Sequence, residues 1–239
     1  MNARRELHFR PAEKAGIWLW GRTEGMTAFL VVLVLSIFVL IPLGQVFPVA
    51  RPFIDLGFTF ILVSGATVVV HRRRATVAIA AFALTNLVLQ WLWYLTEAMW
   101  LLPWLMAFLL IYCGILSTLV FAQVFSGPAV TRHHVQGAIA GYLLLGLTWA
   151  FAYRLVEFFH PGAIQFAHPV DAAHGDPMRG QLVYFSFITL TTVGYGDATP
   201  IEPIARTLAI LEALTGQLFP AVLLARLVSL EVYEHTTRR

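Results

Sequence analysis

Charged residues are scarce in this sequence. Only 12% of its 239 residues are charged and 59% are hydrophobic, whereas a soluble globular domain carries about 25% charged residues. No Asp, Glu, Lys or Arg occurs from residue 98 to 131. Uncharged runs of about 20 residues, long enough to cross a bilayer as a helix, recur along the chain. The sequence therefore predicts an integral membrane protein.

Cysteine is almost absent as well. The single cysteine, Cys113, lies inside an apolar run, so an intrachain disulfide is excluded and cysteine usage does not indicate a redox compartment. The formal net charge of +3 is small, and the basic residues sit at the ends of apolar runs. This distribution suits orientation in a lipid bilayer and argues against nucleic acid as a partner.

Hydropathy predicts an all-α membrane protein with six transmembrane helices, at residues 26–46, 53–70, 75–96, 101–125, 135–159 and 203–232. The first run is longer than the apolar region of a cleaved signal peptide, roughly 7 to 15 residues. With six crossings, nearly all basic residues between segments fall on one side, which is expected to be cytoplasmic. We therefore predict a multi-pass plasma-membrane protein with both termini in the cytoplasm.

A short helix is predicted between the last two segments. Asp176 can cap its first amides, and Pro177 suits the first helical position. About 14 residues at about 1.5 Å each give roughly 21 Å, less than the bilayer core of about 30 Å. The chain must therefore enter the membrane and turn back, which requires that protein bury the turn or that it line a water-filled cavity.

The stretch after this helix reads TTVGYGD, at residues 191–197. Its two glycines can take positive φ at little cost, so neighbouring carbonyls can turn toward one axis. Val193 and Tyr195 are then expected to pack outward, and the Thr192 hydroxyl adds one more oxygen. An unhydrated cation needs several oxygens at each level, which four copies around an axis can supply. The helix C-terminus, with its partial negative charge, favours a cation there.

TTVGYGD resembles the signature sequence of the potassium-channel family, in which TVGYG forms the selectivity filter. The resemblance implies a pore module at residues 132–232, with an outer helix, a re-entrant pore helix, an extended filter and an inner helix. It also implies a homotetramer that conducts K⁺ and needs no organic cofactor. The residues implied to bind dehydrated K⁺ are Thr192, Val193, Gly194, Tyr195 and Gly196, with Asp197 at the outer mouth and Thr189 and Thr191 as pore-helix support.

One feature of some family members is missing. Their pore helix carries a carboxylate, four residues before the filter threonine, that bonds to the aspartate of the outer mouth. Here that position is Ile188. We therefore expect filter stability and slow inactivation to differ.

The predicted inner helix contains two residues that could form a gating hinge. Gly216 stands at the spacing where related inner helices carry a hinge glycine, and Pro220 lacks the amide hydrogen that would bond to the Gly216 carbonyl. We predict a kinked gating hinge there; the alternative is a static bend or a packing glycine. Glu212, an ionisable residue in a spanning helix, is a functional candidate. We expect it to bond behind the filter with Thr189 or Ser186, the alternatives being a place in the cavity or an ion pair.

The segments before the pore module divide into residues 1–25, an interfacial N-terminus, and residues 26–131, a four-helix region; residues 233–239 form the tail. Six-segment relatives often carry arginines at every third position of the fourth helix, which this chain lacks. Arg72, Arg73 and Arg74 are consecutive and would spread around a helix, so only weak voltage dependence is predicted. The four helices could form a scaffold, a lipid-sensing collar or an unrecognised sensor. The histidines and aspartates of the outer loop match no tight metal motif and are interpreted as solvated: His168, Asp171, His174 and Asp176.

Three other functions were weighed against a potassium-selective channel. A less selective cation channel would need a relaxed filter. A membrane receptor or enzyme would use the first four helices, which show no paired carboxylates, no nucleophile with its base and no metal-ligand cluster, so no enzyme activity is expected. A regulatory subunit that does not conduct alone is the third.

Overall fold

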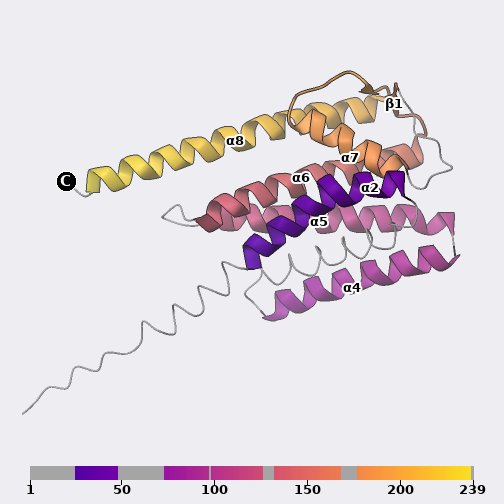
Figure 1. Ribbon diagram of the computed structural model, residues 1–239, viewed down its shortest axis with the longest axis horizontal. Coiled ribbons are helices and arrows are strands. Elements are labelled where there is room, and N and C mark those ends of the chain that lie inside the picture. The colour runs from indigo at the N-terminus through magenta and orange to yellow at the C-terminus, as the bar shows by residue number, and fades with distance from the viewer. Residues whose placement is uncertain (1–24, 48–72, 97, 126–131, 168–176, 238–239) are drawn as a thin grey trace, which may run out of the picture.

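The computed structural model describes residues 25–47, 73–96, 98–125, 132–167 and 177–237. Most of them are helical (Figure 1). Several sequence predictions lie outside the described residues: the N-terminal segment up to residue 24, the second spanning segment at 53–70, Arg72, and the outer-loop cluster His168, Asp171, His174 and Asp176.

The elements follow in the order η1 (Ser36–Leu40), α2 (Ile41–Val46), α4 (Arg73–Thr96), η3 (Met99–Leu101), α5 (Leu102–Val124), α6 (Arg132–Phe159), β1 (Ile164–Phe166), α7 (Pro177–Leu190), β2 (Ala198–Pro200) and α8 (Pro203–Thr237). η1 is a π-helical turn inside the first span and ends two residues before Pro42. Three other helices have a proline at their first or second position, where the missing amide hydrogen costs little: α5, α7 and α8.

Four helices of the described chain are long and apolar enough to cross a membrane: Gly25–Gly44, Met99–Val124, His134–Phe159 and Pro203–Arg226. They coincide with four of the six predicted segments. The predicted segment at 75–96 forms one helix, α4, but its apolar stretch is the shorter Ala81–Trp93. The all-α membrane architecture is thus confirmed, whereas the count of six spans stays a prediction.

The core lies where α5 and α6 pack along each other and against the first span. Leu33, Leu116 and Leu144 are completely or almost completely buried there. Close approach depends on glycines of α6: a Cβ at Gly141 would lie within 2.4 Å of the Phe121 ring. Interiors packed this densely leave no room for an extra methyl group.

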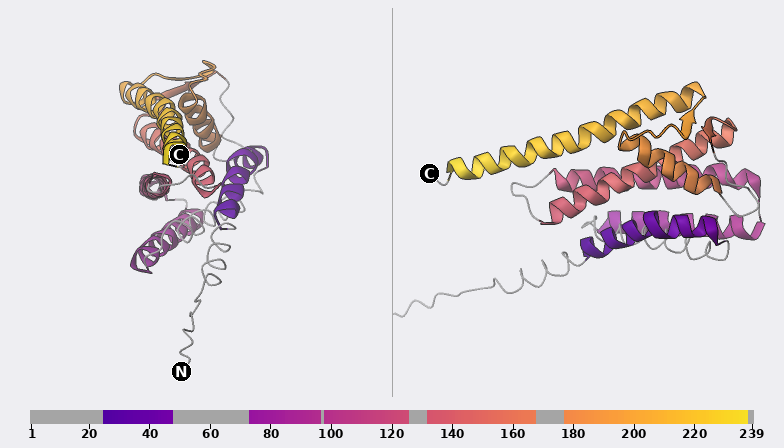
Figure 2. Two further views of the ribbon diagram at one scale, coloured as in Figure 1. Left: turned by 90° about the vertical axis from the view of Figure 1, so that its left-hand side faces the viewer. Right: turned by 45° about the horizontal axis from the view of Figure 1, so that its top comes forward.

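α7 is held between α6 and α8, near the end of α8 that lies away from the C-terminus (Figure 1). The segment after α6 pairs with the segment before α8 as two short antiparallel strands, β1 and β2, with Gln165 opposite Thr199. α8 runs on past the other described helices, as the right-hand view of Figure 2 shows. The fold thus fixes α7 on two sides and ties both of its flanking segments together.

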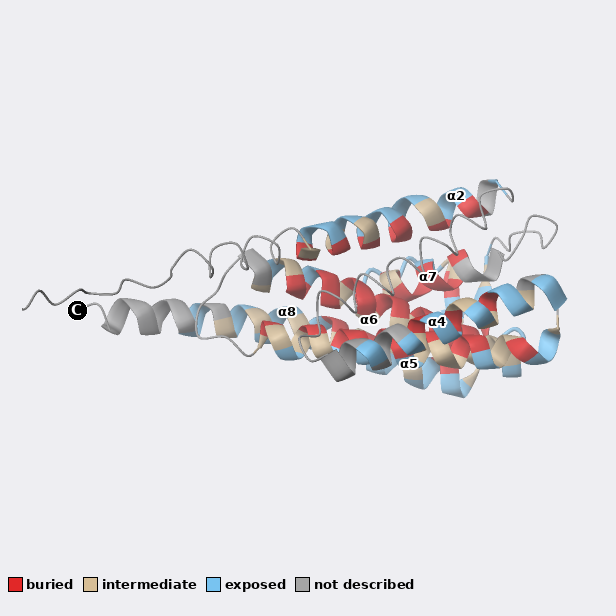
Figure 3. Cartoon of the chain, turned by 90° about the horizontal axis from the view of Figure 1, so that it is seen from below, coloured by how far each residue is buried: buried red, intermediate tan, exposed pale blue. Residues whose placement is uncertain are grey.

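Within one chain, α8 is much less buried than the other apolar spanning helices. Half of the His134–Phe159 span is buried, but only 11% of the Pro203–Arg226 span is. Seen from below, red buried residues concentrate in α5, α6 and α7, while α8 is largely pale blue and tan (Figure 3). An apolar helix surface of this size must face either lipid or another protein surface.

Candidate functional site

The candidate site begins where α7 ends. α7 has 14 residues, too few to cross a bilayer core of about 30 Å at about 1.5 Å per residue. After Leu190 the chain continues without helical structure, and two successive amides, of Val193 and Gly194, donate to the Ile188 carbonyl oxygen at 2.9 and 3.1 Å. The Thr192 amide donates to the Thr189 carbonyl oxygen at 2.9 Å. These bonds fix the start of the segment Thr192–Gly196 against the end of α7. We call this segment the strand; it is distinct from β1 and β2.

The backbone of this strand alternates in the sign of φ. φ is 58° at Thr192, 50° at Gly194 and 83° at Gly196, and among the described residues Thr192 is the one non-glycine with positive φ. In an ordinary strand φ is negative throughout and successive carbonyls point to opposite sides. Reversing φ at every second residue turns alternate peptide planes over. An alternation of this kind can bring successive carbonyls to one side, which an ordinary strand does not do.

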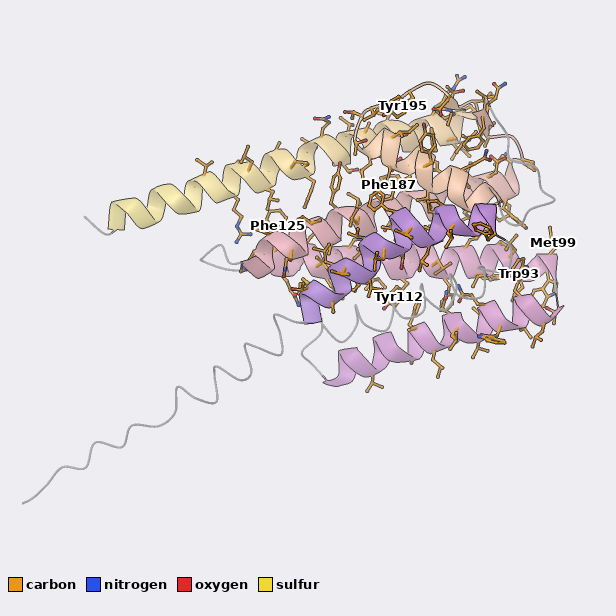
Figure 4. The ribbon with its side chains drawn as sticks, viewed as in Figure 1. Trp93, Met99, Tyr112, Phe125, Phe187 and Tyr195 are labelled. Atoms are coloured by element: carbon orange, nitrogen blue, oxygen red, sulfur yellow. The ribbon has the colours of Figure 1, made fainter. Side chains whose placement is uncertain are left out.

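The strand is open in a single chain. Thr192, Gly194 and Gly196 are exposed, Val193 is 50% exposed and Tyr195 is 72% exposed. Figure 4 shows the labelled Tyr195 at the edge of the molecule. Val193 and Tyr195 were expected to pack outward against protein, but one chain does not provide that cover.

A side chain of α8 reaches the first residue of the strand. Gln217 Nε2 donates to Thr192 Oγ1 at 2.7 Å. The two predicted support threonines act locally: Thr189 accepts the Thr192 amide through its carbonyl oxygen, and the Thr191 hydroxyl donates to the Phe187 carbonyl oxygen at 2.6 Å. Gln217 was missed by sequence reasoning, although its place directly after Gly216 on the predicted inner helix was a usable signal.

Asp197 has a partner on α7, although not a carboxyl group. The Tyr184 hydroxyl donates to Asp197 Oδ2 at 2.7 Å, from a position one helical turn before Ile188. α7 is not one of the four candidate spans, and the hydrogen bond to Asp197 raises the pKa of Tyr184 to about 12. The tyrosine therefore remains a donor to a higher pH than an ordinary tyrosine would. Sequence reasoning noted the absent carboxylate and missed this replacement.

Glu212 lies at the meeting point of α6, α7 and α8. Its side chain is completely buried. Oε1 lies 2.5 Å from the Ser186 hydroxyl of α7, and Oε2 accepts from the Tyr153 hydroxyl of α6 at 2.6 Å. Of the two hydroxyls that the sequence suggested, Ser186 is the partner that the structure places there and Thr189 is not. Tyr153 was not foreseen.

Gly216 packs directly against the backbone before the strand. A Cβ at Gly216 would lie 1.9 Å from the Leu190 carbonyl oxygen, and the same oxygen accepts from the Tyr142 hydroxyl at 3.2 Å. This close approach supports the alternative that Gly216 is a packing glycine. α8 is one continuous helix through Pro220, and the hinge at Gly216 and Pro220 stays a prediction.

The loop after α6 is clamped by Glu157. Its carboxylate accepts from the Gly162 amide at 2.6 Å and from the Ile164 amide at 3.2 Å. The Ala167 amide in turn donates to the Asp197 carbonyl oxygen at 2.8 Å. The segment beyond the strand is thus connected to the end of α6. In the part of the chain that the structure describes, no group of three His, Cys, Asp or Glu residues could hold a metal ion.

Comparison with known proteins assigns this region. Residues 141–232 match the family model of ion channels. The matched region contains most of α6, all of α7, the strand and most of α8. The match supports an ion channel and, with the four candidate spans, a multi-pass membrane protein.

Three curated relatives each match less than half of the chain. The two pore potassium channel c of Oryza sativa subsp. japonica is 34% identical over 110 residues, which are 45% of this chain and 21% of the relative. Protein LctB of Geobacillus stearothermophilus is 52% identical over 90 residues, 37% of this chain and 63% of the relative. Protein LctB of Bacillus caldotenax is 37% identical over 89 residues, 36% and 64% respectively. The aligned part is less than two thirds of each of these relatives. No solved structure matches the chain.

Proposed function

We propose that the protein is a potassium-selective channel in which four copies assemble around a central pore. The observation that carries this proposal is the alternating sign of φ from Thr192 to Gly196, directly after a helix too short to span the membrane. Aligned carbonyl oxygens can replace the water around a K⁺ ion. In this proposal Thr192, Val193, Gly194, Tyr195 and Gly196 bind dehydrated K⁺, and Asp197 stands at the outer mouth.

The exposure of the strand supports assembly. A row of backbone carbonyls at membrane depth cannot face lipid, because each unsatisfied polar group would cost several kcal/mol. It must therefore line a water-filled pore or contact protein. The half-exposed Val193 and the exposed Tyr195 need cover that their own chain does not give. Neighbouring copies would provide it and close the ring of oxygens.

The exposed apolar face of α8 supports the same arrangement. It presents large side chains that one chain leaves open: Ile204, Ile210, Leu211, Leu214, Leu218 and Val222. As an inner helix, α8 would line the pore and contact the neighbouring copies. The similarity to a two pore potassium channel of rice supports K⁺ as the permeant ion. We place the channel in the plasma membrane, with both termini in the cytoplasm.

Flux through liposomes containing the purified protein tests the proposal. K⁺ flux far above Na⁺ flux, blocked by Ba²⁺, and an assembly mass of four chains are expected. Equal K⁺ and Na⁺ flux would instead indicate a less selective cation channel. No flux at all would leave a non-conducting subunit, a receptor or an enzyme.

Three glycines allow a matched comparison. Gly162, Gly194 and Gly196 all have positive φ, and a Cβ would meet nothing within 4 Å at any of them in one chain. Alanine at positive φ costs about 1–2 kcal/mol at each position. Gly194→Ala and Gly196→Ala are expected to abolish selective K⁺ flux, whereas Gly162→Ala, in the loop after α6, keeps it. Equal loss in all three variants would show that strain alone, and not the strand, matters.

A further inference from the structure

The carboxyl group of Glu212 has a hydroxyl on each oxygen. Oε1 lies 2.5 Å from Ser186 Oγ, and Oε2 lies 2.6 Å from the Tyr153 hydroxyl. Ser186 Oγ makes a second contact, at 2.7 Å, with the carbonyl oxygen of Gly146 in α6. α6, α7 and α8 are therefore joined by one continuous hydrogen-bond network.

This hydrogen-bond network has few protons to donate. A serine hydroxyl has one proton to donate, and a carbonyl oxygen can only accept. The contact between Ser186 and Gly146 therefore uses the Ser186 proton. The contact between Ser186 and Glu212 then needs a proton from Glu212 itself. If Glu212 were ionised, Ser186 would divide one proton between two acceptors, and two contacts as short as 2.5 and 2.7 Å would not be expected.

The surroundings of Glu212 also favour the neutral acid. Its side chain is 0% exposed, and a buried carboxylate without a cation costs several kcal/mol. The ionisable groups acting on it from α6 are the phenols of Tyr153 and Tyr142. On its own helix, Arg206 donates to the Pro200 carbonyl oxygen and Arg226 to the Val124 carbonyl oxygen. Neither contact involves Glu212.

We propose that Glu212 is a neutral carboxylic acid that donates from Oε1 to Ser186 and accepts from Tyr153 at Oε2. Through these bonds it positions α7 against α6 and α8, so that the strand begins where the pore requires it. This second step rests on the proposed channel function. In a tetramer, neutral Glu212 side chains avoid placing four negative charges behind the filter. Glu212 is then a positioning residue with no direct contact to the ion.

Infrared spectroscopy of the protein in lipid bilayers tests the protonation directly and does not depend on conduction. The C=O stretching band of a protonated carboxyl group is expected in the wild type at neutral pH. It should be lost in Glu212→Gln and kept in Glu202→Gln, which removes another glutamate near the start of α8. A band that is absent from the wild type, or that persists in Glu212→Gln, would overturn the proposal.

Liposome flux tests the positioning role. A glutamine at 212 reproduces the pattern, because its amide N–H can donate to Ser186 and its carbonyl can accept from Tyr153. Glu212→Gln should keep the K⁺/Na⁺ flux ratio within about twofold, whereas Glu212→Ala should lower it about tenfold or more, since it leaves two buried hydroxyls without their partner. A glutamine variant as defective as the alanine variant would refute the positioning by a neutral acid. A wild type that carries the infrared band but no K⁺ flux would refute the channel proposal alone.

Discussion

Thr192 is the residue on which the strand turns. It holds φ at 58° without being glycine, a conformation that costs an ordinary residue roughly 1–2 kcal/mol. Gln217 donates to its hydroxyl at 2.7 Å from α8, and a net hydrogen bond of about 0.5–1.5 kcal/mol offsets much of that cost. α8 therefore stabilises the first level of the proposed filter.

Replacing Gln217 by leucine removes this donor and keeps much of the side-chain volume. We expect the K⁺/Na⁺ flux ratio to fall by about 2- to 10-fold, the equivalent of one lost hydrogen bond. Gln165→Leu, at an exposed glutamine in β1, is the control and should leave the ratio unchanged. If Gln217→Leu kept the wild-type ratio, Thr192 would be held by its backbone bonds alone.

Tyr184 is the second residue with a specific prediction. Tyr184→Phe removes the donor to Asp197 Oδ2 and changes nothing else in the side chain. We expect K⁺ flux to decay faster during sustained efflux, because the outer end of the strand loses one of its anchors to α7. Time-resolved flux or single-channel recording measures this decay.

The pH dependence of the same contact follows from its raised pKa. The hydrogen bond raises the pKa of Tyr184 to about 12, so the neutral donor is present below that pH and is lost only above it. At about pH 10 a free tyrosine is half ionised, but Tyr184 should still donate. Wild-type flux that fell with a midpoint near pH 10, in a manner absent from Tyr184→Phe, would show that the contact is weaker than the geometry indicates.

The strand could be predicted from the sequence, whereas most hydrogen-bond partners of the site residues could not. The strand itself was predicted because seven consecutive residues carry its chemistry. Tyr184, Gln217 and Tyr153 were missed because each meets its partner across 13, 25 or 59 residues of chain. Such contacts arise from how helices pack, which no local pattern in one sequence encodes. The Ser186 partner of Glu212 could be suggested because the pore helix is short and few hydroxyls lie on it.

At the scale of elements, α8 is joined to α5 near Pro220. The Phe219 ring packs against Phe121 of α5 at 4.7 Å between centroids and stacks on Tyr142 of α6 at 5.7 Å. Farther along, Arg226 donates to the carbonyl oxygen of Val124 at 3.2 Å and lies 5.3 Å from the centroid of the Phe125 ring, labelled in Figure 4. A cation at a helix C-terminus is favourable, so the end of α5 holds the part of α8 beyond Pro220.

Removal of the Phe219 ring should therefore loosen α8 beyond Pro220. We expect Phe219→Ala to lower stability by about 1–3 kcal/mol, as for a partly buried aromatic side chain, and to raise hydrogen exchange of amides after Pro220. Leu95→Ala, at a 74% exposed position of α4, should change neither. Unchanged exchange in Phe219→Ala would mean that α8 is held by its neighbours in the assembly and not by α5.

The elements were predicted unevenly for physical reasons. α7 was predictable, because Asp176 and Pro177 signal its start and the glycine-rich strand its end. The exposure of α8 was not, since a hydropathy pattern does not distinguish lipid from a neighbouring copy. The π-helical turn Ser36–Leu40 was also missed; it precedes Pro42, whose missing amide hydrogen disturbs the regular helical bonding.

At the scale of the whole molecule, charge is distributed unlike that of a voltage sensor. Two of the four candidate spans, Gly25–Gly44 and Met99–Val124, contain no charged residue. Arg206, near the start of α8, and Arg226, farther along it, each donate to a backbone carbonyl, and Glu157 accepts from two backbone amides. These contacts fix the charges to the scaffold on which they lie.

We therefore expect conductance to depend only weakly on voltage. Moving one elementary charge through a potential of about 100 mV changes the free energy by roughly 2.3 kcal/mol, and steep gating needs several such charges in each subunit. The charges named above are engaged by the backbone and are not arranged as a set that could move together. Conductance measured across a planar bilayer from negative to positive potentials should follow a slope of less than about one elementary charge per channel. A steep curve that corresponds to several gating charges would contradict this and would place a mobile charged element among the first helices.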